Sequence, residues 1–126
     1  MLSLVEHIAV KRVYDEVTED DGIRVLVDRL WPRGISKTDE RIDEWYKELA
    51  PSHELRRWFH THGDFLNFTK KYRKELEERE EAVAALEKLC GLTKESERVT
   101  LVFASKDEAQ NNAVVLKQVL QEKISE

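Results

Sequence analysis

Two short runs of consecutive apolar residues constrain the fold of this chain more than any other feature. They are residues 25–27 (VLV) and 101–103 (LVF). Successive side chains of a strand point to opposite faces of a sheet, so a strand without polar alternation must be covered on both faces. The long stretch between the two runs has room for helices. The pattern therefore predicts two parallel strands joined by a helical crossover.

Apolar residues repeat at helical spacing in four other stretches. They lie within residues 42–49, 55–59, 65–89 and 109–124. The third is expected to be one long helix that ends at Gly91, because glycine commonly terminates helices. The sequence thus predicts helices on both sides of the second apolar run.

A further strand is expected near the amino terminus, where residues 7–15 (HIAVKRVYD) mix β-branched and aromatic side chains. The acidic loop that follows is too short for a helical crossover. This strand should therefore run antiparallel to the strand at 25–27, or else not be its neighbour. The fold class predicted is α/β, with a small mixed or parallel sheet of about three strands and helices packed against it. The 126 residues are expected to form a single domain.

The charge balance limits the possible partners. The net charge is −5, which gives no bulk attraction to nucleic acid or to an anionic membrane. No apolar run approaches the roughly 20 residues of a membrane-spanning helix, so no membrane association is expected. The single cysteine, Cys90, suits a reducing cytosol, and a cytoplasmic location is predicted. A site for an anion would have to be a local feature that opposes the overall charge.

Polar side chains follow both predicted parallel strands. The first run continues into DRLWPRG (residues 28–34), and the second continues into SKDEAQNN (residues 105–112). Carboxyl ends of parallel strands meet at the edge of a sheet where α/β proteins bind ligands. Six residues are expected to converge there: Asp28, Arg29, Arg33, Lys106, Asp107 and Asn111.

Two more segments extend this predicted site. Ser52 is typical of a helix start, with Arg56 one turn further on, and free N–H groups beside an arginine favour an anion. Lys37 adds a positive charge. Asp107 is also a candidate N-cap of the last helix. The ligand would be held by Arg29, Arg33, Lys37, Ser52, Arg56, Lys106 and Asn111, with Asp28 or Asp107 as general acid or base.

The pattern favours a small anionic ligand, such as a nucleotide, a sugar phosphate or a carboxylate, bound by an enzyme or a sensor. The alternative is an interaction or structural module in which the same residues form an ion-pair network. Trp45, Tyr46 or Trp58 would then meet a partner chain or a second copy. A groove for single-stranded nucleic acid is a third interpretation, which the net charge disfavours.

His53, His60 and His62 are close enough in the sequence to suggest a metal site, but we assign none, because such histidines are more often surface or capping residues.

Long motifs in the sequence resemble one known family. DDGIRVLVDRLWPRGISKTDERIDEWYKELAPSHELRRWF, then YRKEL and VTLVFASKDEAQNNAVVL, are similar to the YeaO-like family, domain of unknown function 488. The similarity covers nearly the whole chain and implies the fold and the polar positions of the motif rather than an activity. Family motif positions fall on Asp21, Gly22, Arg24, Asp28, Arg29, Trp31, Pro32, Arg33, Gly34, Lys37, Asp43, Trp45, Pro51, Ser52, Leu55, Arg56, Trp58, Phe59, Tyr72, Asp107 and Asn111. The chain departs from the family pattern at HTHGDF (residues 60–65) and at QNNA (residues 110–113).

Overall fold

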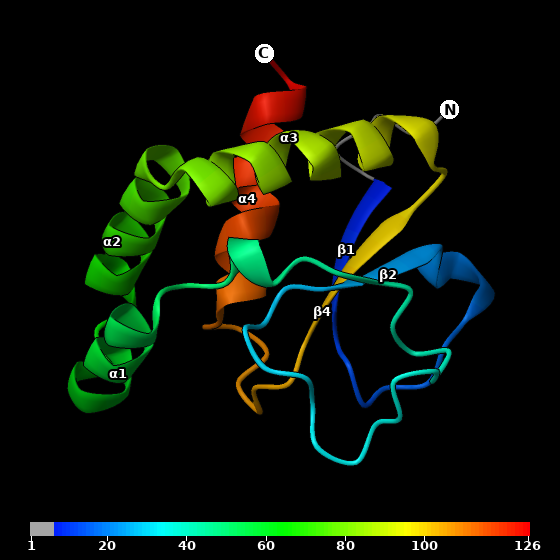
Figure 1. Cartoon of the computed structure of the whole chain (residues 1–126), viewed down its shortest axis with the longest axis horizontal. Coiled ribbons are helices and arrows are strands. Elements are labelled where there is room, and N and C mark those ends of the chain that lie inside the picture. Colours follow the sequence, from blue (N-terminus) through cyan, green and yellow to red (C-terminus); the bar gives the residue numbers. More distant parts are fainter. Residues whose placement is uncertain (1–6) are drawn as a thin grey trace.

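The protein has an all-parallel sheet with helices on one side (Figure 1). The structure, a computed structural model, describes residues 7–126. The strands and α-helices in chain order are β1 Ile8–Arg12, β2 Ile23–Leu26, β3 Glu44–Trp45, α1 His53–His62, α2 Phe65–Glu78, α3 Glu80–Glu95, β4 Val99–Phe103 and α4 Asn112–Ile124. The strand order is β1-β4-β2-β3. The predicted α/β class and the parallel pairing of β2 with β4 are confirmed, and the sheet has one strand more than expected.

The first strand, β1, pairs in parallel with β4, which separates it from β2. The expectation that β1 is not a neighbour of β2 is confirmed, and the antiparallel alternative is wrong. The connection from β1 to β2 contains only the short 3-10 turn Glu19–Asp21 and no α-helix. A buried side chain organises this short link instead: the Arg24 guanidinium donates to the carbonyl oxygens of Val13 and Asp15, each at 3.1 Å. These hydrogen bonds thus fix the segment after β1 beside the Arg24 side chain of β2.

Arg24 is fully buried, and its charge is compensated by Asp21 at 2.7 Å. The carboxylate of Asp21 accepts hydrogen bonds from the Thr18 N–H and hydroxyl, from Lys11 and from Arg24. Burial by itself would raise the pKa of Asp21, but these hydrogen bonds outweigh it and lower the pKa to about 2. Gly22 has a φ of 62°, and a Cβ there would lie 2.1 Å from the Arg98 carbonyl oxygen. Three positions of the family motif therefore have structural roles.

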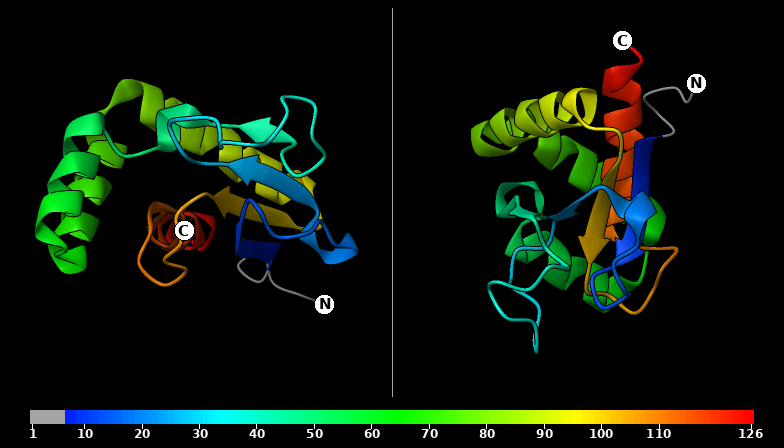
Figure 2. Two further views of the ribbon diagram at one scale, coloured as in Figure 1. Left: turned by 90° about the horizontal axis from the view of Figure 1, so that it is seen from below. Right: turned by 90° about the vertical axis from the view of Figure 1, so that its right-hand side faces the viewer.

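The two faces of the sheet are covered by different kinds of structure. On one face, Val25, Val27 and Leu101 belong to a core shared with α1, α2, α3 and α4. On the other face, Leu26 and Val102 pack against Ile35, Ile42 and the rings of Trp31 and Trp45. Two-sided burial is thus confirmed, but the second layer is the loop after β2 and not a helix. Figure 2 shows α1 and α2 beyond α4, on the side away from the sheet.

Two predicted helices have a different form. Residues 42–49 were expected to be helical, but they contain β3 and a 3-10 turn at Lys47–Leu49, because Trp45 pairs with Leu26 at the sheet edge. The long helix expected over residues 65–89 is two helices, which meet at Arg79 in an extended conformation. Gly91 lies inside α3 and does not end it. Ala82 is buried and Val83 is exposed, so the apolar face shifts after Leu76 and the chain turns there.

Candidate functional site

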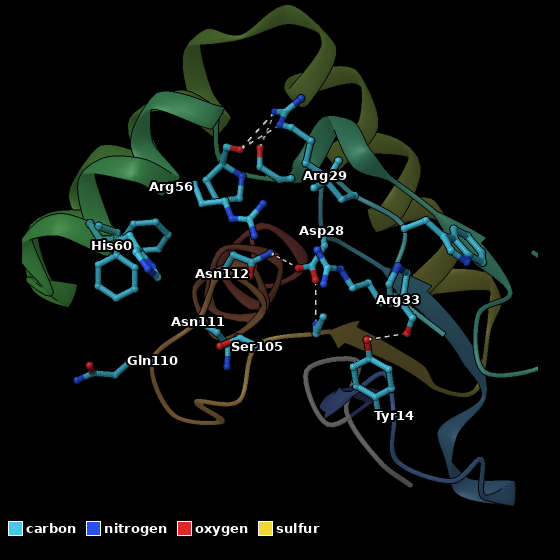
Figure 3. A pocket seen from close by; sticks show the side chains of 18 residues that line it. Tyr14, Asp28, Arg29, Arg33, Arg56, His60, Ser105, Gln110, Asn111 and Asn112 are labelled. Atoms are coloured by element: carbon cyan, nitrogen blue, oxygen red, sulfur yellow. Dashed lines mark hydrogen bonds between the residues drawn. The ribbon is translucent and has the colours of Figure 1, made fainter. Parts of the chain in front are cut away.

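A pocket lies at the carboxyl ends of β2 and β4, as the strand pattern predicts (Figure 3). Its volume is about 620 Å³. The walls come from the loop after β2, α1 and the two residues Ala50 and Pro51 before it, Phe68 of α2, Tyr14, and the segment from β4 into the start of α4. The lining residues are Tyr14, Asp28, Arg29, Leu30, Trp31, Pro32, Arg33, Ala50, Pro51, Arg56, Phe59, His60, Phe68, Ala104, Ser105, Gln110, Asn111 and Asn112.

Asp28 joins three elements in the pocket wall. One carboxylate oxygen accepts the Ala104 N–H at 2.8 Å, and the other accepts the Asn112 side-chain amide at 3.2 Å. Its own carbonyl oxygen accepts the Trp45 indole N–H at 2.8 Å. Burial raises the pKa of Asp28, and the two hydrogen bonds and the charge of Arg56 only partly oppose this effect. Asp28 is therefore a partly buried acceptor that links the ends of β2 and β4 to the first turn of α4.

Two arginines from different segments present guanidinium groups to the pocket. Arg56 comes from α1 and Arg33 from the loop after β2, and Figure 3 shows both directed toward the region of Asp28. Both are exposed, and within residues 7–126 neither guanidinium makes a hydrogen bond or an ion pair. The Tyr14 hydroxyl donates to the Arg33 carbonyl oxygen at 3.0 Å and holds that part of the loop. Arg33 and Arg56 thus line the same pocket from two different segments of the chain.

Arg29 has a different orientation. Its guanidinium donates to the carbonyl oxygens of Ala50 and Pro51 at 3.3–3.4 Å, and Figure 3 shows it turned away from Asp28. It lines the pocket, but its donors are directed to the backbone just before α1. The Arg29 side chain therefore connects the loop after β2 to the backbone just before α1.

Ser52 begins α1 as predicted, and its side chain accepts the Leu55 N–H. The chain's own Glu75 occupies this helix start: it accepts the Ser52 N–H at 2.8 Å and the Ser52 hydroxyl at 2.5 Å. A helix N-terminus favours an anion, and here the anion is internal. Ser52 lies outside the residues that line the pocket.

Lys37 and Lys106 also lie outside the pocket lining. The Lys37 ammonium sits 4.4 Å from the centre of the Trp31 ring and 4.8 Å from that of Trp45. The Lys37 ammonium thus makes cation–π contacts with both tryptophan rings. Lys106 is exposed after β4. Unlike Arg33 and Arg56, neither lysine is among the residues that line the pocket.

Asp107 is exposed and outside the pocket lining, where it accepts the N–H groups of Ala109 and Gln110. These two hydrogen bonds lower its pKa. The expectation that Asp107 caps the last helix is wrong, because α4 begins at Asn112 with Asn111 as N-cap. Asp107 instead stabilises the turn before that helix.

Asn111 is buried and lines the pocket, with its side chain occupied by capping. It accepts the Val114 N–H at 3.0 Å and donates to the Asp107 carbonyl oxygen at 2.9 Å. The neighbouring Asn112, which sequence reasoning missed, donates to both Val27 and Asp28. The only signal for Asn112 was its place in the Asn-Asn pair after the second strand.

Tyr14, Phe59, His60 and Phe68 also line the pocket and were not predicted as site residues. Among the other histidines, His62 stacks on Trp58 with the ring centres 4.7 Å apart. In the described part of the chain, no three His, Cys, Asp or Glu side chains are grouped as metal ligands would be. Within the same residues, no helix has the length and apolar character needed to cross a bilayer.

Comparison with known proteins shows the family of this chain. A family model described as the inactive DUF488-N3 subclade matches residues 7–126. The chain belongs to this family. It is 44% identical over 111 residues to the uncharacterized protein YeaO of Escherichia coli K12, a match covering 87% of this chain and 93% of that protein. It is 45% identical over 114 residues to the uncharacterized protein Mb3100c of Mycobacterium bovis, covering 90% and 92%. No solved structure matches the chain. The resemblance seen in the motifs is thereby confirmed.

Proposed function

We propose that this member of the DUF488-N3 family binds a small anionic ligand in the pocket beside Asp28. The observation that carries the proposal is the pair Arg33 and Arg56, whose guanidinium groups face the pocket with no hydrogen bond or ion pair inside the described chain. Guanidinium groups make strong charge-assisted hydrogen bonds to phosphate and carboxylate. Two of them at one pocket, in a protein with a net charge of −5, form a local site for an anion.

The geometry supports binding rather than turnover. Asp28 is the only carboxylate among the described residues that line the pocket, and both of its oxygens already accept hydrogen bonds. Asp107, the other candidate acid or base, lies outside that lining. The description of the matching subclade as inactive is in keeping with a ligand site without acid–base chemistry.

A thermal-shift experiment with matched variants tests the proposal. The probes are sulfate, phosphate, a nucleoside monophosphate, a sugar phosphate and a dicarboxylate at low ionic strength. At 100 times its dissociation constant a ligand adds about 2.7 kcal/mol to the free energy of unfolding, which is a clear rise in Tm. Arg56→Ala should remove the shift. Arg57→Ala should retain it, because Arg57 is the exposed neighbour on α1 and does not line the pocket.

Two results would overturn the proposal. One is that none of the anions raises Tm at millimolar concentration. The other is that Arg56→Ala and Arg57→Ala lose the shift equally, since this would indicate a nonspecific effect of charge. Arg33→Ala gives an independent check from the opposite wall of the pocket and should also weaken binding.

The interaction-module alternative receives less support. Trp45, Tyr46 and Trp58 are half-buried and packed against the core, so they do not form an open apolar face. The most exposed large apolar side chains described are Leu30 and Leu66, on the loop after β2 and on α2. The pocket is therefore the more specific feature of the molecule.

A further inference from the structure

The pocket is much larger than a bare anion requires. A volume of about 620 Å³ lies within the 300–1,000 Å³ typical of sites for whole small molecules. An inorganic phosphate held by Arg33 and Arg56 would leave most of this space unfilled. The ligand should therefore carry a substantial group beyond its anionic part.

The two ends of the pocket differ in chemistry. Across the view of Figure 3, His60 lies at one end, Arg56 and Asp28 in the middle, and Arg33 toward the other end. Phe59, next to His60 on α1, packs against Phe68 with the ring centres 4.6 Å apart, and both rings line the pocket. The end at His60 thus has the rings of Phe59 and Phe68, whereas the end at Arg33 has the Tyr14 ring beside an arginine.

The end at His60 is suited to a flat ring. Phe59 is half-buried and is held by Phe65 and Phe68, so its orientation is set by the helix pair and not by a ligand. A preorganised aromatic side chain binds nucleobases by stacking, whatever the base. Asp28 lies between the two ends, and each of its oxygens keeps a lone pair that could accept a ligand hydroxyl.

We infer that the ligand is a nucleoside monophosphate, with its phosphate on Arg33 and Arg56, its ribose hydroxyls near Asp28 and its base against Phe59. This inference rests on the proposed function and extends it from an anion to an aromatic anion. It requires the base and the phosphate to contribute separately to affinity.

Isothermal titration calorimetry with two probes separates these contributions. The probes are adenosine monophosphate and ribose 5-phosphate, which share the phosphate and the sugar. The nucleotide should bind about tenfold more tightly, the effect expected of one stacked base. Phe59→Leu should remove that advantage and leave the affinity for ribose 5-phosphate unchanged.

Leu66→Ala is the matched control, because Leu66 is an exposed apolar side chain on α2 that does not line the pocket. It should retain the preference for the nucleotide, and the Tm of both variants shows whether each is folded. Equal affinities of the two probes for the wild type would overturn this inference while leaving anion binding intact. Binding of neither probe, nor of sulfate, would overturn the proposed function as well. If a variant fails to fold, the ratio of the two wild-type affinities still decides the inference.

Discussion

Replacing Asp21 by asparagine should destabilise the protein strongly, although the side chain keeps its shape. Every partner of the two carboxylate oxygens is a donor: Thr18, Lys11 and Arg24. An asparagine must therefore turn its own NH₂ group toward one of these donors. It also leaves the fully buried Arg24 guanidinium without its compensating charge.

The expected size follows from the burial of this pair. Arg24 is 0% and Asp21 6% exposed, and removing one partner of a buried ion pair costs about 3–5 kcal/mol. Asp21→Asn keeps some hydrogen bonds, so we expect a loss of about 3 kcal/mol at pH 7. The loss must depend on pH. The pKa of Asp21 is lowered to about 2 in the folded protein, below the roughly 3.9 of an unfolded chain. Its ionised form therefore stabilises the fold above pH 4, and this contribution is lost as the pH falls toward 2.

Urea unfolding followed by tryptophan fluorescence measures both effects. The difference in free energy of unfolding between wild type and Asp21→Asn should be about 3 kcal/mol at pH 7 and clearly smaller at pH 3. Asp20→Asn is the matched control, since the adjacent Asp20 is exposed, and it should change stability by less than about 0.5 kcal/mol. A difference for Asp21→Asn below about 1 kcal/mol, or one that is the same at both pH values, would refute the reasoning.

Three further predictions concern the turn at Gly22, the start of α1 and the pocket. Gly22→Ala should lower the free energy of unfolding by at least about 3 kcal/mol, because the new Cβ would clash with the Arg98 carbonyl group. Gly91→Ala, in open space within α3, should instead raise it by about 0.5 kcal/mol. Equal urea midpoints of the two variants would contradict this prediction. Ser52→Ala should cost about 1–2 kcal/mol through the lost cap and the lost hydrogen bond to Glu75, and a cost below about 0.5 kcal/mol in urea unfolding would contradict it. Sulfate binding, measured by calorimetry, should strengthen as the pH falls from 7, because burial raises the pKa of Asp28 and its neutral form no longer competes for Arg56. In the Asp28→Asn variant, the sulfate affinity should no longer rise in this way as the pH falls. The same pH dependence in the variant and the wild type would contradict the prediction.

The sequence by itself determined the framework of the fold and the place of the pocket. Two uninterrupted apolar runs are sufficient to specify strands that are buried on both faces, and their separation specifies parallel pairing. Ser52 marked the start of α1 because a cap is a local interaction between residues three apart. The polar segments after the two strands then had to meet at one edge of the sheet.

Local patterns were misleading where a distant partner decided the conformation. The spacing of residues 42–49 suits a helix, but pairing of Trp45 with Leu26 draws the chain into the sheet. The periodicity through residues 65–89 suits one helix, but burial of Ala82 instead of Val83 changes the buried face at Arg79. In both cases the local preference amounts to a few tenths of a kcal/mol per residue, less than the gain from tertiary packing.

Only the tertiary structure decided which of the predicted cationic and capping groups remain available to bind a ligand. Arg29 and Arg33 lie in the same loop, yet Arg29 donates to the carbonyl oxygens of Ala50 and Pro51, while the Arg33 guanidinium has no such acceptor among residues 7–126. The helix start at Ser52 was an expected anion site, but the carboxylate of Glu75, from the next helix, occupies it in the folded protein. A long polar side chain turns toward whatever donors and acceptors folding brings within about 3 Å, and those groups come from parts of the chain whose proximity no local pattern encodes.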